Sequence, residues 1–571
     1  MKRIIILLIA AIAAASCNTD TMKEKEIHLK IIETTDVHGA VFPENLIEQN
    51  TREGSLAQVY AYVKRQRESC DCEVVLLDNG DILQGSPVVY YYNFEAPDSV
   101  HLVARVMNFM NYDAATVGNH DIEAGHKVYD KFRNELNFDL LAANAVRDDN
   151  GKPYFKPYKI IERQGVKIAV LGLITPAIPN WLPHNIWSGM HFEDMVESAR
   201  YWQKYIEENE SPDLMIGLLH SGTDATFGGA NPDDPKNENA AVLVAGKVPG
   251  FDVIFAGHDH RFANYFVANP DGDSTLIIDP AAHAANVGIA DITLKFNDKT
   301  EKYRKEIKGD IVSMKDIKPD SLFKYKFNLG LEAVKKWVNR PVGVLKNKIN
   351  AGDALYGPSP FVDLIHKAQL ELTGADVSFA APFSVTAVIN KGQLYVRDMF
   401  KIYRYENFLY TMKMTGKEIR DYLEFSYSLW FNNSTDKNAP LLAVKTDENG
   451  KPEVYDNGMP ALINPYYNFD SGAGIKYIVD LKKPVGQRVT IVSMADGSSF
   501  DPCKTYTVAM NSYRGNGGGK HLTQGAGIPK DSLSSRLISS SESDFRLLFM
   551  KWIEKQGSIK AESMGLWEVK R

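Results

Sequence analysis

The sequence predicts a two-domain α/β protein, and three observations support this. The chain has 571 residues, more than a single hydrophobic core usually organises. Over its first half, short apolar runs rich in β-branched residues alternate with helix-like segments, as in layered α/β domains. After that the composition becomes richer in Tyr, Phe, Asn and Gly, with turn signals such as Asp447-Glu448-Asn449-Gly450.

The chain begins with a targeting signal. Lys2-Arg3 precedes an apolar run over 4–15, and Ala15-Ser16-Cys17 follows. The run is typical of a secretory signal, and small residues before a cysteine resemble the lipobox of bacterial lipoproteins. We therefore expect a lipoprotein signal over 1–17 that ends at Cys17, with Cys17 lipidated as the first residue of the mature chain, and a tether over 18–26. The alternative is a plain secretory signal with a chance cysteine.

Composition limits the partners. The rest of the chain contains no run of the ~20 apolar residues that a transmembrane helix needs, so membrane contact is expected only through the lipid anchor. The protein would then be extracytoplasmic, most readily on the periplasmic face of the outer membrane. A net charge of −7 and a pI near 6.1 give no sign of the basic surface that binds polymeric nucleic acid, so we expect no such partner. We expect a monomer.

Three further cysteines, Cys70, Cys72 and Cys503, do not indicate a disulfide framework. Their number is odd, and a Cys70–Cys72 bridge would close a very tight loop. We expect all three to be structural, with buried apolar thiols.

The elements of the first domain can be read from the apolar pattern. Predicted strands of a buried sheet cover 27–33, 74–77, 114–117, 168–174, 214–219, 253–255 and 276–278. Segments 55–67 and 192–207 have the spacing of helices that pack on a sheet.

A linker is expected next. A charged stretch over 299–318 precedes a predicted amphipathic helix over 320–339, which ends before Pro341. These features give a first domain over 27–310, a linker with a helix over 311–345, and a second domain over 346–571.

Asp, Asn and His side chains follow five of the predicted strands. They are Asp36 and His38, then Asp81, Asn119 with His120, His220, and finally His258 with His260. Sites in open α/β folds assemble at the carboxyl ends of strands, so we expect these residues to meet at one edge of one sheet. Each motif alone is common in solvated loops. Five such motifs in this order, each after a predicted strand, are not explained as chance loop residues.

The ligand types indicate the chemistry. Imidazole and carboxylate together suit first-row divalent ions, whereas a structural zinc site usually has thiolates. Seven side chains for two ions leave room for a bridging carboxylate and a water, as in two-metal hydrolytic sites.

These motifs resemble the five signature blocks of the calcineurin-like metallophosphoesterases: Asp36-x-His38, Gly80-Asp81, Gly118-Asn119-His120, His220 and Gly257-His258-Asp259-His260. With its large C-terminal domain, the chain resembles the bacterial 5'-nucleotidase family, which includes the 2',3'-cyclic-nucleotide 2'-phosphodiesterase/3'-nucleotidases. The resemblance implies a four-layer α/β/β/α sandwich, a linker helix and a second, α+β substrate-binding domain.

The resemblance also implies a ligand set for two divalent ions of the Mn, Zn or Co type. Asp36, His38 and His260 would hold one ion. Asn119, His220 and His258 would hold the other, with Asp81 bridging the two.

His120 is implied to act on the substrate, by stabilising charge on the phosphate or by assisting the leaving group. A neighbouring carboxylate would orient its ring. The family often has Asp three residues after this His, and this chain has Glu123 there. Asp121 is the other candidate, and Glu123 could also be a solvated residue at a helix start.

Substrate residues are implied in the second domain. The segments around Tyr405 and Tyr513 resemble the two that supply base-stacking aromatics, with Asn407 as a contact to the base edge. The arginines that hold phosphate in the family's 5'-nucleotidases are absent from 381–388, and this stretch resembles the cyclic-phosphodiesterase branch.

We therefore expect hydrolysis of 2',3'-cyclic nucleotides and 3'-nucleotides, in extracytoplasmic nucleotide salvage. The alternatives are a 5'-nucleotidase or UDP-sugar hydrolase, hydrolysis of a sulfur ester or a non-nucleotide phosphoester on the same scaffold, and a nucleotide-binding lipoprotein without activity.

Overall fold

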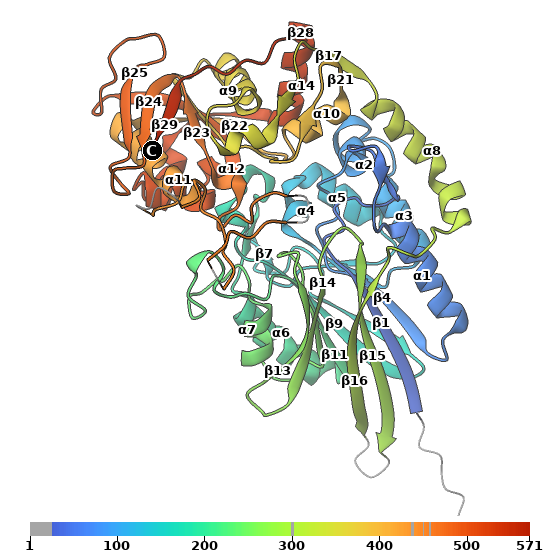
Figure 1. Ribbon diagram of the computed structural model, residues 1–571. Coiled ribbons are helices and arrows are strands. Elements are labelled where there is room, and N and C mark those ends of the chain that lie inside the picture. Colours follow the sequence, from blue (N-terminus) through green and yellow to red (C-terminus); the bar gives the residue numbers. More distant parts are fainter. Residues whose placement is uncertain (1–25, 298–301, 435–438, 449, 456–457) are drawn as a thin grey trace, which may run out of the picture.

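The computed structural model describes residues 26–297, 302–434, 439–448, 450–455 and 458–571. Two domains lie one above the other, and helix α8 (Ser321–Val338) runs along one side (Figure 1). The expected leader, with Cys17, lies outside the described residues. In the described part of the chain, no helix combines the length and apolarity that a membrane crossing requires.

The first domain contains two six-stranded sheets. The first has the order β16 (Lys302–Ser313), β15 (Asn286–Asn297), β1 (Glu26–Thr34), β4 (Glu73–Asp78), β5 (Ala114–Thr116) and β6 (Asp139–Leu141). The second has the order β13 (Phe262–Ala268), β14 (Ser274–Pro280), β12 (Val253–Phe255), β11 (Leu214–His220), β9 (Val166–Ile174) and β8 (Tyr158–Arg163).

All seven predicted strands are present, but the expectation of one sheet was wrong. The first three predicted strands became β1, β4 and β5 of the first sheet, and the other four became β9, β11, β12 and β14 of the second. A continuous apolar run is buried on both faces in either sheet. Its sequence therefore does not say which sheet it joins.

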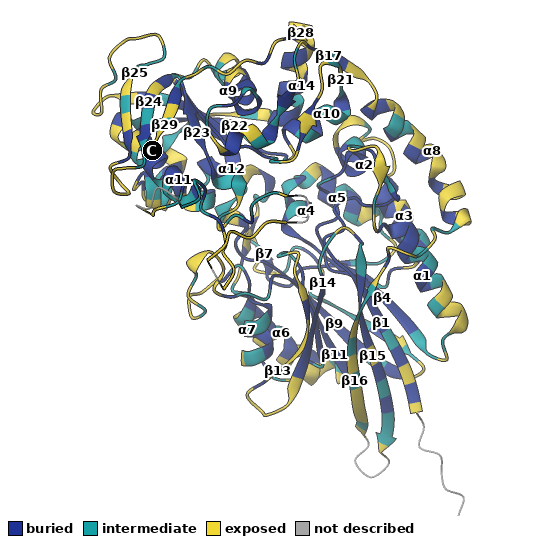
Figure 2. Cartoon of the chain, in the orientation of Figure 1, coloured by how far each residue is buried: buried dark blue, intermediate teal, exposed yellow. Residues whose placement is uncertain are grey.

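Helices cover both outer faces, which gives the four layers that the resemblance implies. Apolar side chains such as Ile31, Val75 and Ile168 fill the space between the sheets. Helices α1 (Leu56–Ser69) and α3 (Leu102–Met110) bury their apolar faces with the core of the first sheet. Helices α6 (Met195–Glu210) and α7 (Ala241–Lys247) cover the second sheet. The central strands are largely buried, whereas the edge strands β13 and β16 and the outward faces of the helices carry exposed residues (Figure 2).

Helix α8 confirms the helix predicted over 320–339. Asp320 caps it by accepting a hydrogen bond from the backbone of Phe323 at 3.0 Å. Phe327 and Val334 lie on its buried face, in the same core as residues of α1 and α3. The connection between the domains is therefore packed against the first domain.

The second domain has a mixed five-stranded sheet with helices around it. The sheet order is β23 (Ser471–Ala473), β19 (Val377–Ala380), β26 (Thr505–Asn511), β22 (Phe408–Thr415) and β27 (Leu537–Asp544). The main helices are α9 (Pro360–Thr373), α11 (Gly416–Trp430) and α14 (Phe545–Gln556). The domain also contains two three-stranded sheets. One has the order β21 (Gly392–Tyr395), β17 (Pro341–Leu345) and β28 (Ser558–Ile559), and the other has the order β25 (Val489–Met494), β24 (Ile475–Asp480) and β29 (Trp567–Lys570).

Polar contacts join the two domains across their boundary. The hydroxyl of Tyr90 donates to Asp544 at 2.7 Å, and Lys401 pairs with Glu48 at 2.7 Å. These contacts fix the second domain over the strand ends of the first.

The cysteines differ from expectation. Cys70 and Cys72 form a disulfide, and both are half-buried. The short loop is possible because helix α1 ends at Ser69 and the backbone of Cys70 turns extended. Cys503 is free and exposed rather than buried.

Candidate active site

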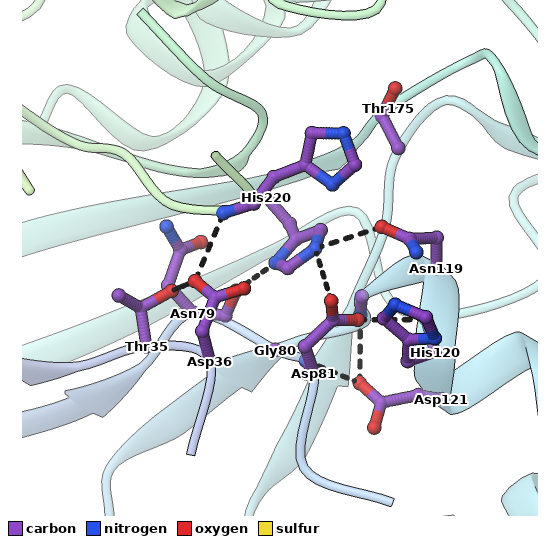
Figure 3. Close-up of polar contacts among 12 residues, drawn as sticks. Thr35, Asp36, Asn79, Gly80, Asp81, Asn119, His120, Asp121, Thr175 and His220 are labelled. Atoms are coloured by element: carbon purple, nitrogen blue, oxygen red, sulfur yellow. Dashed lines mark hydrogen bonds and ion pairs between the residues drawn. The ribbon is translucent and has the colours of Figure 1, made fainter. Parts of the chain in front are cut away.

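The carboxyl ends of strands from both sheets meet at one place, so both sheets contribute side chains to a single site. The backbone N–H of Asp36 donates to the carbonyl of Gly80 at 2.9 Å, between neighbouring strands of the first sheet. The amide of Asn79 donates across to the carbonyl of Leu219 in the second sheet at 3.0 Å. The hydroxyl of Thr116 makes a similar bond to Leu218 at 3.0 Å. Figure 3 shows the resulting cluster.

Several of the predicted ligands have left-handed backbone conformations. The φ angles are 49° at Asp36, 48° at His38, 56° at Asp81, 78° at His258 and 57° at His260. Residues other than glycine rarely adopt positive φ, and such strain concentrates at functional sites. The sharp turns after the strands therefore aim these side chains at a common point.

One group of ligand atoms comes from Asp36, His38 and His260, which lie within 4.8 Å of one another. Nε2 of His38 is 3.1 Å from Nε2 of His260. Oδ1 of Asp36 is 3.2 Å from Nε2 of His260 and, among the described residues, has no hydrogen-bond donor.

A second group comes from Asp81, His220 and His258. Nε2 of His220 is 3.2 Å from Oδ2 of Asp81 and 3.2 Å from Oδ1 of Asn119. Figure 3 shows His220 between these two side chains. Gly118 allows this arrangement, because an added Cβ would lie 2.1 Å from Oδ1 of Asp81.

These residues fit a pair of divalent ions. The carbonyl of Asn79 lies 2.6 Å from Nδ1 of His220, and the carbonyl of Gln84 lies 3.1 Å from Nδ1 of His38. A carbonyl oxygen only accepts, so each ring donates through Nδ1 and turns the lone pair of Nε2 toward the cluster. Metal-ligating histidines are commonly held in this way, and the unpartnered Oδ1 of Asp36 supplies a matching anion.

The partner of His120 is Glu123. Nδ1 of His120 is 2.5 Å from Oε2 of Glu123. Asp121 is engaged elsewhere, since it accepts hydrogen bonds from the backbone of Gly118, Asp81 and the two residues that follow Asp81. Helix α4 (Asn119–Glu123) thus places Glu123 one turn from the ring that it orients.

The charges around His120 favour its protonated form. Burial opposes the charge on the ring, but the carboxylates of Asp81 and Glu123 outweigh it and raise the pKa of His120 to about 9. With only these side chains acting on it, the imidazole carries its proton at neutral pH. It can then donate a hydrogen bond to a phosphate oxygen.

A cavity of about 430 Å³ connects these residues with the second domain. Asn119 and His120 line it from one side. All three residues predicted to hold a base, Tyr405, Asn407 and Tyr513, line it from the other. The structure therefore brings them to the same cavity.

The tyrosines are held by their surroundings. The ring of Tyr405 packs edge-on against Phe383, with centroids 5.7 Å apart. The ring of Tyr513 lies against Gly518, where an added Cβ would be 2.6 Å from it. The buried side chain of Arg514 fixes the glycine-rich segment 515–519 by donating to the Gly518 carbonyl at 2.8 Å and to Asp470 at 2.8 Å.

Three residues near the site were missed by the sequence reasoning. The ring centroid of His283 is 5.5 Å from that of His38, and His283 follows β14 just as the predicted ligands follow their strands, so the same signal could have found it. Oε1 of Glu238 is 3.1 Å from Nε2 of His258. The ring of Trp181 stacks on the His258 ring, with centroids 5.6 Å apart. Glu238 and Trp181 come from loops without such a signal.

Comparisons with known proteins agree with this architecture. The calcineurin-like phosphoesterase family matches residues 29–262. The 5'-nucleotidase C-terminal domain matches residues 341–524.

The chain is a calcineurin-like phosphoesterase with a 5'-nucleotidase C-terminal domain. It is therefore a hydrolase of the metallophosphoesterase class, and this class implies divalent metal ions.

Two curated relatives resemble most of this chain. The trifunctional nucleotide phosphoesterase YfkN of Bacillus subtilis is 25% identical over 95% of it, although the chain spans only 39% of that relative. The 2',3'-cyclic-nucleotide 2'-phosphodiesterase/3'-nucleotidase of Salmonella typhimurium is 26% identical, over 98% of this chain and 91% of the relative.

Solved structures share the fold. The 5'-nucleotidase precursor of Thermus thermophilus superposes with a TM-score of 0.63 at 21% identity, over 95% of this chain and 100% of that one. The sulfate thiohydrolase SoxB of the same organism superposes with a TM-score of 0.56 at 16% identity, over 95% and 96%. Since a 5'-nucleotidase and a sulfate thiohydrolase share this fold, the fold alone does not select the substrate.

Proposed function

We propose that this protein hydrolyses phosphoesters of nucleotides, with 2',3'-cyclic nucleotides and 3'-nucleotides ahead of 5'-nucleotides. The observation that carries the proposal is the single cavity lined by metal-ligand candidates, His120 and the three base-contact candidates. The names of the relatives support nucleotide phosphoester hydrolysis.

In the proposed site, Asp36, His38 and His260 would hold one ion, and Asn119, His220 and His258 the other, with Asp81 between them. When bound, two such ions offset charge on the phosphoryl oxygens and lower the pKa of water enough to yield a nucleophile near neutral pH. Imidazole, carboxylate and amide ligands suit Mn, Zn or Co.

The side chains of the protein itself would bind the substrate and act on its phosphoryl group. His120, oriented by Glu123, would donate a hydrogen bond to the phosphoryl group or protonate the leaving oxygen. Tyr405 and Tyr513 hold the base, and Asn407 contacts its edge.

The preference for cyclic and 3'-nucleotides rests on the stretch 381–388. It contains no arginine to hold a terminal phosphate, and Phe383 from this stretch lines the cavity beside Tyr405. Tyr405 and Tyr513 favour nucleotides over sulfur esters, because a base needs flat apolar faces.

The proposed location is extracytoplasmic, with a lipid anchor at Cys17 and the nucleotide salvage role that goes with it. The Cys70–Cys72 disulfide supports this, because disulfides persist in oxidising compartments.

A hydrolysis panel tests the proposal. Purified protein loaded with Mn, Co or Zn would be given 2',3'-cyclic AMP, 3'-AMP, 5'-AMP, UDP-glucose, bis(p-nitrophenyl) phosphate and p-nitrophenyl sulfate. We expect kcat/KM to be highest for 2',3'-cyclic AMP and 3'-AMP. A higher value for 5'-AMP or UDP-glucose would favour the alternative nucleotidase assignment. If the protein cleaves bis(p-nitrophenyl) phosphate but none of the nucleotides, the proposal is wrong.

Replacing Tyr405 and Tyr513 together with Ala is expected to raise KM for 2',3'-cyclic AMP by about one to three orders of magnitude, the loss of two stacking faces. Hydrolysis of bis(p-nitrophenyl) phosphate should hardly change, since it reaches the ligand groups without the base pocket. Steady-state kinetics of both substrates checks this. Tyr356→Ala is the matched control, because Tyr356 is an exposed tyrosine of the same domain. Equal loss of both activities in the double variant would contradict the base-pocket assignment.

A further inference from the structure

Two of the base-contact candidates, Tyr405 and Asn407, belong to the short segment 403–407, and both line the cavity of about 430 Å³ beside the metal-ligand groups. The segment lies between helix α10 (Val396–Ile402) and strand β22 and belongs to neither. The regular hydrogen bonds of a helix or a sheet therefore do not set its shape, and its peptide groups need other partners.

The buried side chain of Arg546, in the first turn of α14, supplies such partners. Its Nε donates to the carbonyl of Tyr403 at 2.8 Å, and its Nη2 donates to the carbonyl of Arg404 at 2.5 Å. Its Nη1 donates to the carboxylate of Glu406 at 3.3 Å. One guanidinium thus holds three of the five residues in the segment.

The segment is held at both ends by the start of α14. The backbone N–H of Phe545 donates to the carbonyl of Asn407 at 2.7 Å, which adds to the bond at Tyr403. The side chains of Arg546 and Glu406 are each only 3% exposed. Loss of either one would leave the other charge buried without this partner, which is costly.

The start of α14 also contacts the first domain. The hydroxyl of Tyr90, the last residue of α2 (Pro87–Tyr90), donates to Asp544 at 2.7 Å. Asp544 in turn caps α14 by accepting a hydrogen bond from the backbone of Leu547 at 3.1 Å. The guanidinium of Arg546 lies over the Tyr90 ring, 5.0 Å from its centroid.

Tyr90, Asp544 and Arg546 are not among the described residues that line the cavity with Tyr405 and Asn407. Any effect that they have on a bound base must therefore pass through the segment 403–407.

We propose that Arg546 is a positioning residue for base recognition, which presents Tyr405 and Asn407 to the cavity, and that Tyr90 supports it from the first domain through Asp544. The proposal rests on the proposed function in assigning the base to Tyr405 and Asn407. A guanidinium offers its donors in a fixed planar fork and so holds several acceptors in one arrangement, which the single ammonium group of lysine does not.

The test compares 3'-AMP with inorganic phosphate as competitive inhibitors of bis(p-nitrophenyl) phosphate hydrolysis, at initial rates and a fixed excess of Mn. 3'-AMP competes whether or not it is itself hydrolysed, and the ratio of the two inhibition constants reports what the nucleoside adds to binding.

In Arg546→Lys we expect the inhibition constant of 3'-AMP to rise about tenfold, as for loss of one stacking face. Tyr90→Phe should raise it about threefold, the loss of one hydrogen bond. The constant for phosphate should stay within about twofold in both variants, since the metal-ligand groups are unchanged. Arg488→Lys is the matched control, because Arg488 is another buried arginine of the second domain and donates to Lys483 and Asn433 instead. It should change neither constant.

An unchanged ratio of the two constants in either Arg546→Lys or Tyr90→Phe would overturn the proposal, and a lower Tm in such a variant would assign the network to stability alone. Equal loss of affinity for 3'-AMP and phosphate would also overturn it, as would a wild type that binds 3'-AMP no more tightly than phosphate. If Arg546→Lys does not fold, Tyr90→Phe decides in its place. If the constants shift as expected but no nucleotide is hydrolysed, the proposed function fails and the positioning role stands.

Discussion

Asp81→Asn is expected to abolish measurable turnover. Asp81 lies 3.2 Å from His220 and its Oδ1 accepts the backbone N–H of His120 at 2.8 Å. Asn is nearly the same size, tolerates the positive φ of this position, and can still accept that hydrogen bond. The change therefore removes little except the negative charge that two cations would share. We expect the activity to fall by more than about a hundredfold, the upper end of what loss of an outer-shell partner alone costs.

The measurement pairs kcat/KM with the metal content of the purified variant. Asp259→Asn is the control, because Asp259 is adjacent to two ligand candidates but belongs to neither ligand group. It should retain most of the activity. Near-wild-type turnover by Asp81→Asn with two bound ions would contradict the dinuclear assignment.

His120→Ala is expected to lower kcat by about two to four orders of magnitude, the usual contribution of a positioned general acid or charge stabiliser. The metal content should not change, since His120 belongs to neither ligand group. KM should change much less than kcat if the ring acts chiefly on the transition state. Steady-state kinetics with 2',3'-cyclic AMP and metal analysis of the same preparation check both points.

Glu123→Gln tests whether Glu123 only orients the His120 ring or also favours its protonated form. The amide can still contact Nδ1 of His120, but the charge that favours the imidazolium is gone. We expect a smaller loss of kcat than in His120→Ala. If His120→Ala loses a metal ion, or if Glu123→Gln is as inactive as His120→Ala, the role given to His120 is wrong.

Some of the fold could be read from the sequence because burial leaves a local signature. The strands named in advance are apolar runs buried on both faces, such as β11 and β12. Strand β16 was missed because it is an edge strand with many exposed charged residues, in the segment read as a charged stretch. The Cys70–Cys72 bridge was missed because the geometry after α1, which decides it, is not visible in the spacing.

The site was predictable to the extent that chemistry follows strand ends. Asp36, Asp81 and His220 were found because each comes at or just after a buried strand. Glu123 and Asp121 stayed alternatives, because residues two apart on a short helix differ only in the direction they face. The structure distinguishes them, because Asp121 accepts hydrogen bonds from backbone N–H groups whereas Glu123 contacts His120.

The sequence by itself determined which side chains could bind metal, which strands carry them, and the helix that joins the domains. Only the tertiary structure decided that the strands divide between two sheets, since an apolar run does not encode its neighbours. It also brought Oδ1 of Asp36 within 3.2 Å of Nε2 of His260, although the two residues are 224 positions apart in the numbering. Such contacts depend on packing between segments that are distant in the sequence. Charges and lone pairs interact through space, whereas the sequence specifies only which residues are present and in what order.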